Sequence, residues 1–373
     1  MKQEIITSDK NYQGIDIWIK KHCCNKILLV CGSSIHHQLN LIAHLKKIED
    51  DCVELIKFQK FQPNPLYENV LDGVQVFRKE LCDAIIAVGG GSAIDVAKCI
   101  KLYAKIPDNG QNGSWLNEVP VENNIPFLAI PTTAGSGSEA TKYAVIYYKG
   151  KKQSITSENI IPQTVLLAPD TLKTLPDYQK KATMCDALCH AIESFWSLNS
   201  TDESKELSRS AIHTIIDNID DYINNKESGL KNMLIAANTA GKAINITQTT
   251  AGHAMSYKIT SLFGCSHGHA TILCNRILFS WMIDNVDRCV DPRGKEYLKR
   301  TLNEIGIAMG CKNAESGAKK LQKIFMDLKF QIPKPSETQY TELKTSVNPI
   351  RLKNNPIKLD IETIDKLYRE VLK

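Results

Sequence analysis

Short apolar runs alternate with helical patterns through the first half of the chain, and this alternation limits the fold more than any other feature of the sequence. The runs that predict strands lie at residues 27–31, 53–56, 84–88, 126–130, 143–148 and 164–168, and helices are expected over residues 35–48, 67–81 and 93–104. The run at 143–148 is expected to turn back as a hairpin at Gly150. Strands that alternate with helices form a mostly parallel sheet with helices on both faces, so we predict an α/β domain.

The second half of the chain has a different pattern. From Asp177 onward strand patterns nearly disappear, and helices are expected over residues 180–197, 203–222, 230–246, 253–262, 271–283 and 297–309. Pro169 and Pro176 lie at the transition, and a chain of 373 residues is long enough for two domains. We therefore expect an α/β domain at residues 1–176 and an all-helical domain at residues 177–373.

Composition and charge exclude several kinds of partner. The net charge of +5 is mild, and the lysines are spread along the chain between acids rather than gathered on one segment, so no nucleic-acid groove is expected. There is no apolar run of 18 residues and no signal-peptide pattern at the N-terminus, so no membrane partner is expected. Twelve cysteines without a CxxC pair favour packing roles in a reducing cytoplasm, and this includes Cys185 and Cys189.

The glycine-rich turn after the run at 84–88 predicts a phosphate site. Gly89, Gly90 and Gly91 let the backbone approach a ligand closely, and Ser92 is expected to cap the helix at 93–104, whose N-terminus stabilises negative charge. A strand, this turn and a helix together favour a dinucleotide pyrophosphate, although the motif is neither GxGxxG nor a Walker A loop. A tight turn without a ligand is the alternative.

A second polar loop follows the next strand. Residues 131–139 are rich in hydroxyl groups and glycine, which suits contacts with a ribose, a phosphate or a nicotinamide amide. The alternative is a polar surface loop, but two such loops after neighbouring strands favour a shared ligand.

Four residues of the helical half suggest a metal site. Asp186 and His190 are four residues apart and lie on one helix face, and His253 and His267 lie fourteen residues apart across an expected helix that ends at Gly264. One carboxylate and three imidazoles can hold a divalent ion and leave a position for a substrate oxygen, as catalytic sites require. The alternative for an isolated histidine is a hydrogen-bonded core residue.

Five segments in this order resemble the iron-containing alcohol dehydrogenase family over nearly the whole chain. They are Gly89-Gly90-Gly91-Ser92 with Asp95 and Lys98, the loop at 131–139, Asp186-Ala187 with His190, His253-Ala254-Met255, and His267-Gly268. The resemblance implies an N-terminal nucleotide-binding domain, a helical domain that holds Fe(II) or sometimes Zn, and hydride transfer in the cleft between them. The family's four metal ligands fall on Asp186, His190, His253 and His267.

The nucleotide is expected to be NAD(H) or NADP(H), and a homodimer is expected. The candidate cofactor-binding residues are Gly32, Ser33, Ser34, Gly89, Gly90, Gly91, Ser92, Asp95, Thr132, Thr133, Ser136, Ser138 and Lys152. Many family members carry an Asp after the first strand, which excludes a 2′-phosphate, whereas this chain has Gly32-Ser33-Ser34, which admits NADP(H). Many members also carry a second histidine where this chain has Tyr257, so we expect Tyr257 or a water to supply the proton.

The expected reaction is the metal-dependent reduction of a small aldehyde to a primary alcohol. The segments at 253–258 and 193–197 look most like those of the phosphonoacetaldehyde reductases, which form 2-hydroxyethylphosphonate. Lys258 is the first candidate for neutralising the phosphonate of such a substrate, and Lys142 is the second. A lysine on a helix is more often a solvent-facing charge. The alternatives are a general alcohol, butanol or lactaldehyde dehydrogenase of the same family, a lyase like dehydroquinate synthase, and a non-enzymatic protein, for which a broken ligand set would be expected.

Overall fold

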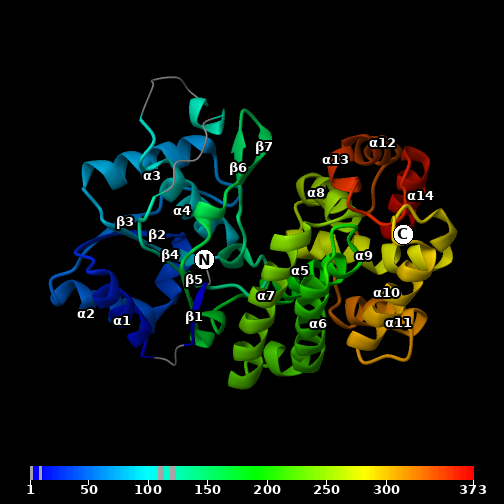
Figure 1. Ribbon diagram of the computed structural model, residues 1–373, viewed down its shortest axis with the longest axis horizontal. Helices are drawn as coiled ribbons and strands as arrows, with labels where there is room; N and C mark the ends of the chain where they lie inside the picture. The colour runs from blue at the N-terminus through cyan, green and yellow to red at the C-terminus, as the bar shows by residue number, and fades with distance from the viewer. Residues whose placement is uncertain (1–2, 8–10, 108–112, 118–122) are drawn as a thin grey trace. The chain divides into compact units, whose positions relative to one another are not determined.

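The computed structural model describes residues 3–7, 11–107, 113–117 and 123–373 of the chain. The chain divides into two compact units, Met1–Leu175 and Pro176–Lys373 (Figure 1).

A parallel sheet forms the centre of the first unit. Within the described residues it has six strands in the order β1-β8-β5-β4-β2-β3. Their bounds are Glu4–Thr7 for β1, Thr164–Leu167 for β8, Phe127–Pro131 for β5, Ala84–Gly89 for β4, Lys26–Cys31 for β2 and Glu54–Phe58 for β3. The strands β4 and β5 are buried at every position, as expected for strands covered on both faces.

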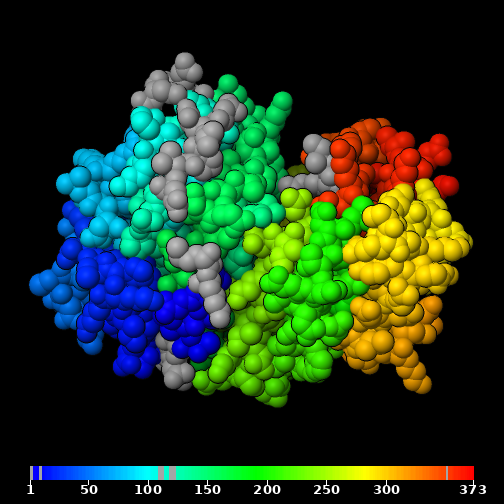
Figure 2. Space-filling view, in the orientation of Figure 1, coloured from blue at the N-terminus to red at the C-terminus, as the bar shows by residue number. Residues whose placement is uncertain are grey.

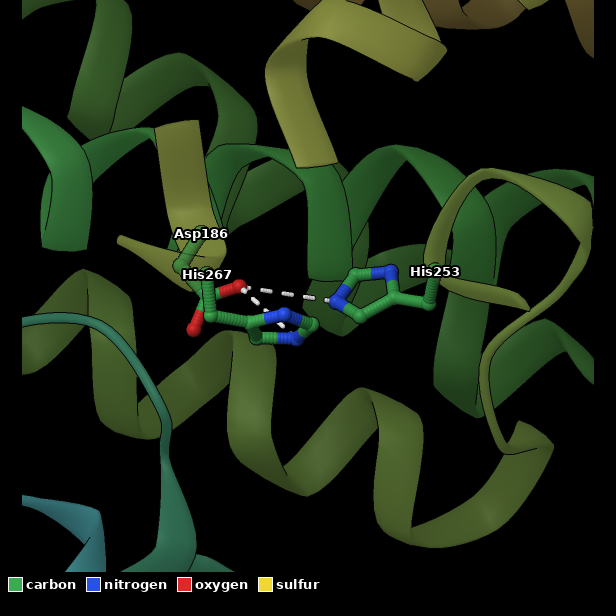
Figure 3. A group of neighbouring side chains, drawn as sticks. All are labelled: Asp186, His253 and His267. Atoms are coloured by element: carbon green, nitrogen blue, oxygen red, sulfur yellow. Dashed lines mark ion pairs between the residues drawn. The ribbon is translucent and has the colours of Figure 1, made fainter. Parts of the chain in front are cut away.

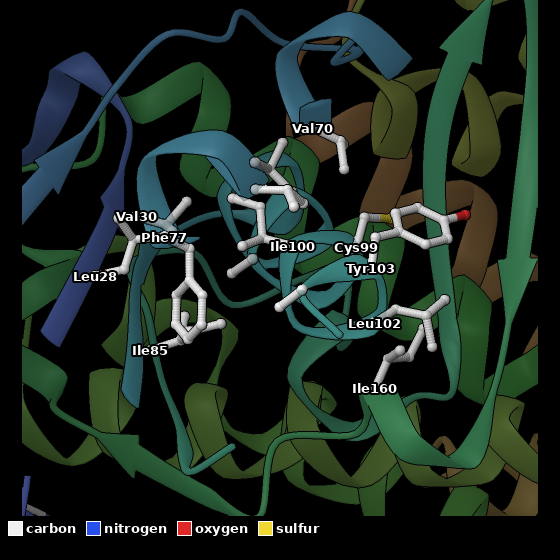
Figure 4. Packing of buried hydrophobic residues seen from close by; sticks show 14 of the residues in the cluster. Leu28, Val30, Val70, Phe77, Ile85, Cys99, Ile100, Leu102, Tyr103 and Ile160 are labelled. Atoms are coloured by element: carbon white, nitrogen blue, oxygen red, sulfur yellow. The ribbon is translucent and has the colours of Figure 1, made fainter. Parts of the chain in front are cut away.

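Helices cover both faces of this sheet. Successive strand residues point to opposite faces: Leu28 and Ile85 pack with α3 (Tyr67–Lys79) and α4 (Gly91–Tyr103), whereas Leu29 and Ile86 pack with α1 (Gln13–His22) and α2 (Leu39–Asp50). Figure 4 shows the first of these clusters, in which Phe77 of α3 lies beside Ile85 of β4. The hairpin is β6 (Tyr143–Tyr148) with β7 (Lys151–Thr156), which pair antiparallel. The α/β prediction and the hairpin at Gly150 are confirmed.

Two local predictions in this unit are wrong. The single helix expected at 35–48 is a 3₁₀ turn, η1 (Ser33–His37), followed by α2, because the buried Gln38 side chain donates to the Thr171 carbonyl at 2.9 Å and holds residue 38 outside helical geometry. Ser92 is not an N-cap. The helix α4 begins at Gly91 because the Gly90 carbonyl accepts the Ala93 and Ile94 amides, which places Ser92 inside the first turn.

The second unit is built from helices. They are α5 (Asp177–Trp196), α6 (Asp202–Ile223), α7 (Glu227–Thr247), α8 (Ala251–Phe263), α9 (His267–Asp284), α10 (Lys295–Ala308), α11 (Ala314–Asp327), α12 (Glu337–Ser346), α13 (Pro349–Leu352) and α14 (Ile361–Val371). The central helix α5 packs against α6, α7 and α9, and nearly all of its residues from Ala182 onward are buried. The last helices pack on α8 and α9 and reach the surface in orange to red in Figure 2. Among the described residues, none of the helices has the length and apolar character of a membrane span.

The turn between α8 and α9 brings these two helices close to α5. Gly264 ends α8 with a left-handed φ of 69°, as predicted, and the next helix, α9, begins at His267. The next residue, Gly268, touches α5, since a Cβ added there would stand 1.9 Å from the Ala182 carbonyl oxygen. Only glycine permits this approach, which sets His267 beside Asp186.

Candidate metal and nucleotide sites

Three side chains from three helices of the second unit converge on one point. Asp186 on α5, His253 on α8 and His267 on α9 each offer one ligand atom, and these atoms lie within 4.8 Å of one another (Figure 3). Asp186 Oδ1 is 3.5 Å from His253 Nε2 and 3.9 Å from His267 Nε2. Asp186 and His253 are buried, whereas the His267 side chain is 34% exposed, so the group is open on one side.

His190, the fourth predicted ligand, lies next to this group without being part of it. It is buried one turn after Asp186 on α5, and its ring stacks on that of His253 with centroids 4.5 Å apart. The ligand atoms of three of the four predicted residues are therefore close enough together to bind one ion, and the fourth residue, His190, packs against His253.

Sequence reasoning missed Glu193, which holds His253 from the other side. Its carboxylate is fully buried and Oε1 lies 2.6 Å from His253 Nδ1. A signal was present in the sequence, because Glu193 follows Asp186 by seven residues and His190 by three and so shares their helix face.

The electrostatics of the cluster favour added positive charge. Burial alone would raise the pKa of the Asp186 carboxyl, but the charges of His190 and His267 outweigh burial and lower it. Burial alone would lower the pKa of the His253 imidazole, but Glu193 and Asp186 outweigh burial and raise it to about 10. The buried atoms Asp186 Oδ1 and His253 Nε2 have no hydrogen-bond partner among the described residues. Two buried atoms of this kind, a carboxylate oxygen and an imidazole nitrogen, fit a bound cation that would take the place of a proton between them.

Tyr257 and Lys258 have different positions relative to the cluster. The Tyr257 ring stacks on the His267 ring at 5.2 Å, which places the tyrosine at the candidate site. The Lys258 amine instead forms an ion pair with Glu342 on α12 and is partly exposed. The second lysine considered, Lys142, pairs with Glu158 at 2.8 Å in the first unit. Both lysines thus have acidic partners that the sequence did not predict.

The two predicted nucleotide loops lie against each other in the first unit. Gly89 pairs with Pro131 across β4 and β5, and its carbonyl accepts the Thr132 amide at 3.0 Å. Gly89 has a φ of +154°, and a Cβ there would stand 2.6 Å from that of Ala93. A Cβ on Gly90 would meet Thr133 at 3.2 Å and one on Gly91 would meet Ser136 at 3.1 Å, so the glycine turn and the hydroxyl-rich loop share one surface.

Asp95 and Ser138, both predicted to contact the cofactor, are hydrogen-bonded to each other. Asp95 accepts the Ser138 hydroxyl at 2.5 Å and the Val145 amide at 2.9 Å. The buried Lys98 amine donates to Ser138 Oγ and to the Thr141 carbonyl. Burial raises the pKa of Asp95 against the positive charges of Lys98 and, less strongly, of Lys152, which places Lys152 near this network. The network links α4 to the second loop and to β6.

The turn after β2 has room for a larger residue. Gly32 has a φ of −74°, and among the described residues a Cβ there would meet only Ser34 Oγ, at 3.9 Å. The Gly32 carbonyl accepts the Gln59 side-chain amide at 3.1 Å. Gln59 also lines a hollow of about 710 Å³ with Lys57, Lys60 and Asp72, in which Lys60 pairs with Asp72 at 3.6 Å.

Comparisons with known proteins place the whole chain in one family. The model of iron-containing alcohol dehydrogenases matches residues 3–169, and that of the C-terminal part of the Fe-containing alcohol dehydrogenase family matches residues 180–372. The phosphonoacetaldehyde reductase of Streptomyces viridochromogenes is 28% identical over 316 residues, 80% of each chain. The NAD-dependent methanol dehydrogenase of Bacillus methanolicus is 30% identical over 268 residues, 69% of this chain and 68% of its own.

The fold matches as well. The iron-containing alcohol dehydrogenase of Thermococcus thioreducens superimposes with a TM-score of 0.88 at 20% identity, covering 100% of this chain and 98% of its own. The chain belongs to the iron-containing alcohol dehydrogenase family and is an oxidoreductase of that type.

Proposed function

We propose that the protein reduces a small aldehyde to a primary alcohol with NAD(P)H, and that Asp186, His190, His253 and His267 hold the metal. The observation that carries this proposal is the pair of buried ligand atoms, Asp186 Oδ1 and His253 Nε2, which face each other at 3.5 Å and have no hydrogen-bond partner within the described part of the chain. Leaving such atoms unsatisfied in a buried site is costly, and a divalent cation offsets that cost.

A metal bound to this set would polarise the aldehyde oxygen as a Lewis acid. One carboxylate and three imidazoles suit Fe(II), Zn and other divalent metals, and the family favours Fe(II). Asp186 provides the negative charge of the set, and the histidines provide neutral nitrogen donors. Tyr257 lies against His267, where its hydroxyl can donate a proton to the developing alkoxide.

The glycine turn and the hydroxyl-rich loop are proposed to bind the nucleotide. No side-chain cap is formed at the N-terminus of α4 in the described residues, and the Gly90 carbonyl accepts the Ala93 and Ile94 amides, so we assign the pyrophosphate to the Gly91 and Ser92 amides before them. The name of the Bacillus methanolicus relative supports a nicotinamide cofactor. For this chain we propose that NADP(H) is accepted as well, because Gly32 presents no carboxylate to exclude a 2′-phosphate.

The first candidate substrate is phosphonoacetaldehyde, supported by the Streptomyces viridochromogenes relative. Its dianion needs a cation, and Lys258 is the candidate. Lys258 can exchange its ion pair with Glu342 for a phosphonate, because both side chains are partly exposed and such surface pairs contribute little to stability. The same ion pair favours a second candidate, an uncharged aldehyde such as butanal or lactaldehyde, since it already satisfies Lys258.

An assay with metal-reconstituted protein under anaerobic conditions tests the proposal. The substrates are phosphonoacetaldehyde, butanal and lactaldehyde, each with NADH and with NADPH. Oxidation of either nucleotide with any of the aldehydes supports the reductase. A preference of at least tenfold in kcat/KM for phosphonoacetaldehyde supports the first substrate. No oxidation with any pair would contradict the proposed reaction.

A further inference from the structure

We infer that Glu193 is a positioning residue, which fixes the His253 ring so that Nε2 points at the metal. The inference rests on the proposed metal site and adds a residue to it. Glu193 touches neither substrate nor metal in this account, because it acts through His253.

The hydrogen bonds of Glu193 determine which nitrogen of His253 carries the proton. Oε1 accepts from His253 Nδ1 at 2.6 Å, from the His253 amide at 3.0 Å and from Asn275 Nδ2 at 2.8 Å. Oε2 accepts from the Thr250 amide and from its hydroxyl at 2.8 Å. An ionised carboxylate can only accept, so the proton of a neutral His253 ring lies on Nδ1 and the lone pair of Nε2 faces Asp186.

Further contacts fix Glu193 itself. Trp196 Nε1 donates to Thr250 Oγ1 at 2.9 Å, so the hydroxyl hydrogen of Thr250 is directed to Glu193. The residue before His253 must be small, since a Cβ on Gly252 would stand 2.5 Å from Glu193 Oε1 and 2.3 Å from Asn275 Nδ2. The carboxylate is therefore held from several directions.

The negative charge of Glu193 is offset through His253. The carboxylate is fully buried, and His253 has the only one of its five donor groups that can carry a positive charge. A buried carboxylate without a cation is unfavourable. A metal on the far side of the His253 ring offsets this charge, and in such carboxylate–histidine–metal arrangements the carboxylate makes the imidazole a stronger donor.

A purely structural role has a different signature. Glu193 also accepts the amides of Thr250 and His253 at the start of α8, and thus caps that helix. If capping were its whole role, replacing Glu193 would lower the stability of the protein and leave the metal affinity of the folded protein unchanged.

The test measures metal affinity directly. Cobalt(II) binding by metal-stripped protein is followed by its visible absorption and by competition with a chelator, for the wild type, Glu193→Gln and Ser194→Ala. Thermal unfolding is measured in parallel. Ser194 is the matched control, because it follows Glu193 on α5 and its buried hydroxyl accepts from Thr247 on α7 at 3.0 Å rather than contacting His253.

Glu193→Gln keeps the shape of the side chain and removes its charge, so the dissociation constant for cobalt should rise about tenfold to a hundredfold and the cobalt spectrum should change. Ser194→Ala should lose stability and keep the wild-type affinity. Wild-type affinity in Glu193→Gln overturns the inference, whereas a wild type that binds no cobalt overturns the proposed metal site. If Glu193→Gln does not fold, Thr250→Val takes its place, because it removes the hydroxyl that donates to Glu193. A loss of at least threefold in cobalt affinity supports the role of Glu193, and an unchanged cobalt affinity overturns it.

Discussion

Replacing Gly268 with alanine should separate two helices that carry metal ligands. The added Cβ would stand 1.9 Å from the Ala182 carbonyl oxygen and 2.9 Å from Asp186 Cβ, and neither atom can be moved by a rotamer change. Real Cβ atoms essentially never approach another atom closer than 3.0 Å, so α5 and α9 must separate locally by about 1.1 Å. Metal–ligand distances tolerate only about 0.2 Å. The separation of α5 from α9 is therefore too large for Asp186 and His267 to stay bound to the same ion.

We expect Gly268→Ala to weaken cobalt or iron binding on the order of tenfold to a hundredfold. The free energy of unfolding should fall by about 1–3 kcal/mol, as for other overpacked sites. Metal titration of the stripped protein and denaturant unfolding followed by circular dichroism measure the two effects.

Gly306→Ala is the matched control. Its Cβ would stand 2.1 Å from the Asn313 carbonyl oxygen, between α10 and α11 of the same unit. It should lose similar stability and keep its metal affinity. Wild-type affinity in Gly268→Ala, or an equal loss of affinity in both variants, would refute the claim that the contact at Gly268 sets the metal site.

Four further variants test the metal ligands, the nucleotide preference and the substrate. Asp186→Ala and His267→Ala should each lose bound metal and NAD(P)H oxidation, measured by metal analysis and absorbance, and full metal content in either variant would show the ligand assignment to be wrong. Gly32→Asp should shift the preference from NADPH toward NADH by about 1–3 kcal/mol, because the turn has room for a carboxylate that repels a 2′-phosphate. Unchanged kinetics with NADPH would contradict this prediction. Lys258→Met should raise KM for phosphonoacetaldehyde about tenfold and leave butanal unaffected. An equal rise in KM for both substrates would show that Lys258 has a structural role, through its ion pair with Glu342.

The sequence predicted the fold where local patterns decide it. The buried run of β4, the glycine turn and the left-handed Gly264 are all encoded by neighbouring residues, and each was found. The helix break at Gln38 was not, because it depends on bonds to Thr171 and Thr174, more than 130 residues away. The strand β1 was also missed, since its four residues gain their order from pairing with β8.

In the candidate site, too, local patterns were predicted and contacts between residues distant in the sequence were not. The i, i+4 spacing of Asp186 and His190 is local, and the pattern led to residues that the structure places together. The role of Asp95 could not be read from the sequence, because its partners lie at positions 138 and 145. Lys258 looked available for the same reason, since Glu342 is 84 residues further along the chain.

Nucleotide oxidation as a function of added metal tests the central claim most directly. Protein stripped of metal is titrated anaerobically with Fe(II) in the presence of NAD(P)H and whichever aldehyde of the panel reacts fastest. The account predicts no oxidation without metal and a rate that rises in proportion to Fe(II) until one ion is bound per chain. Oxidation at the same rate in the metal-free protein with excess chelator would contradict it.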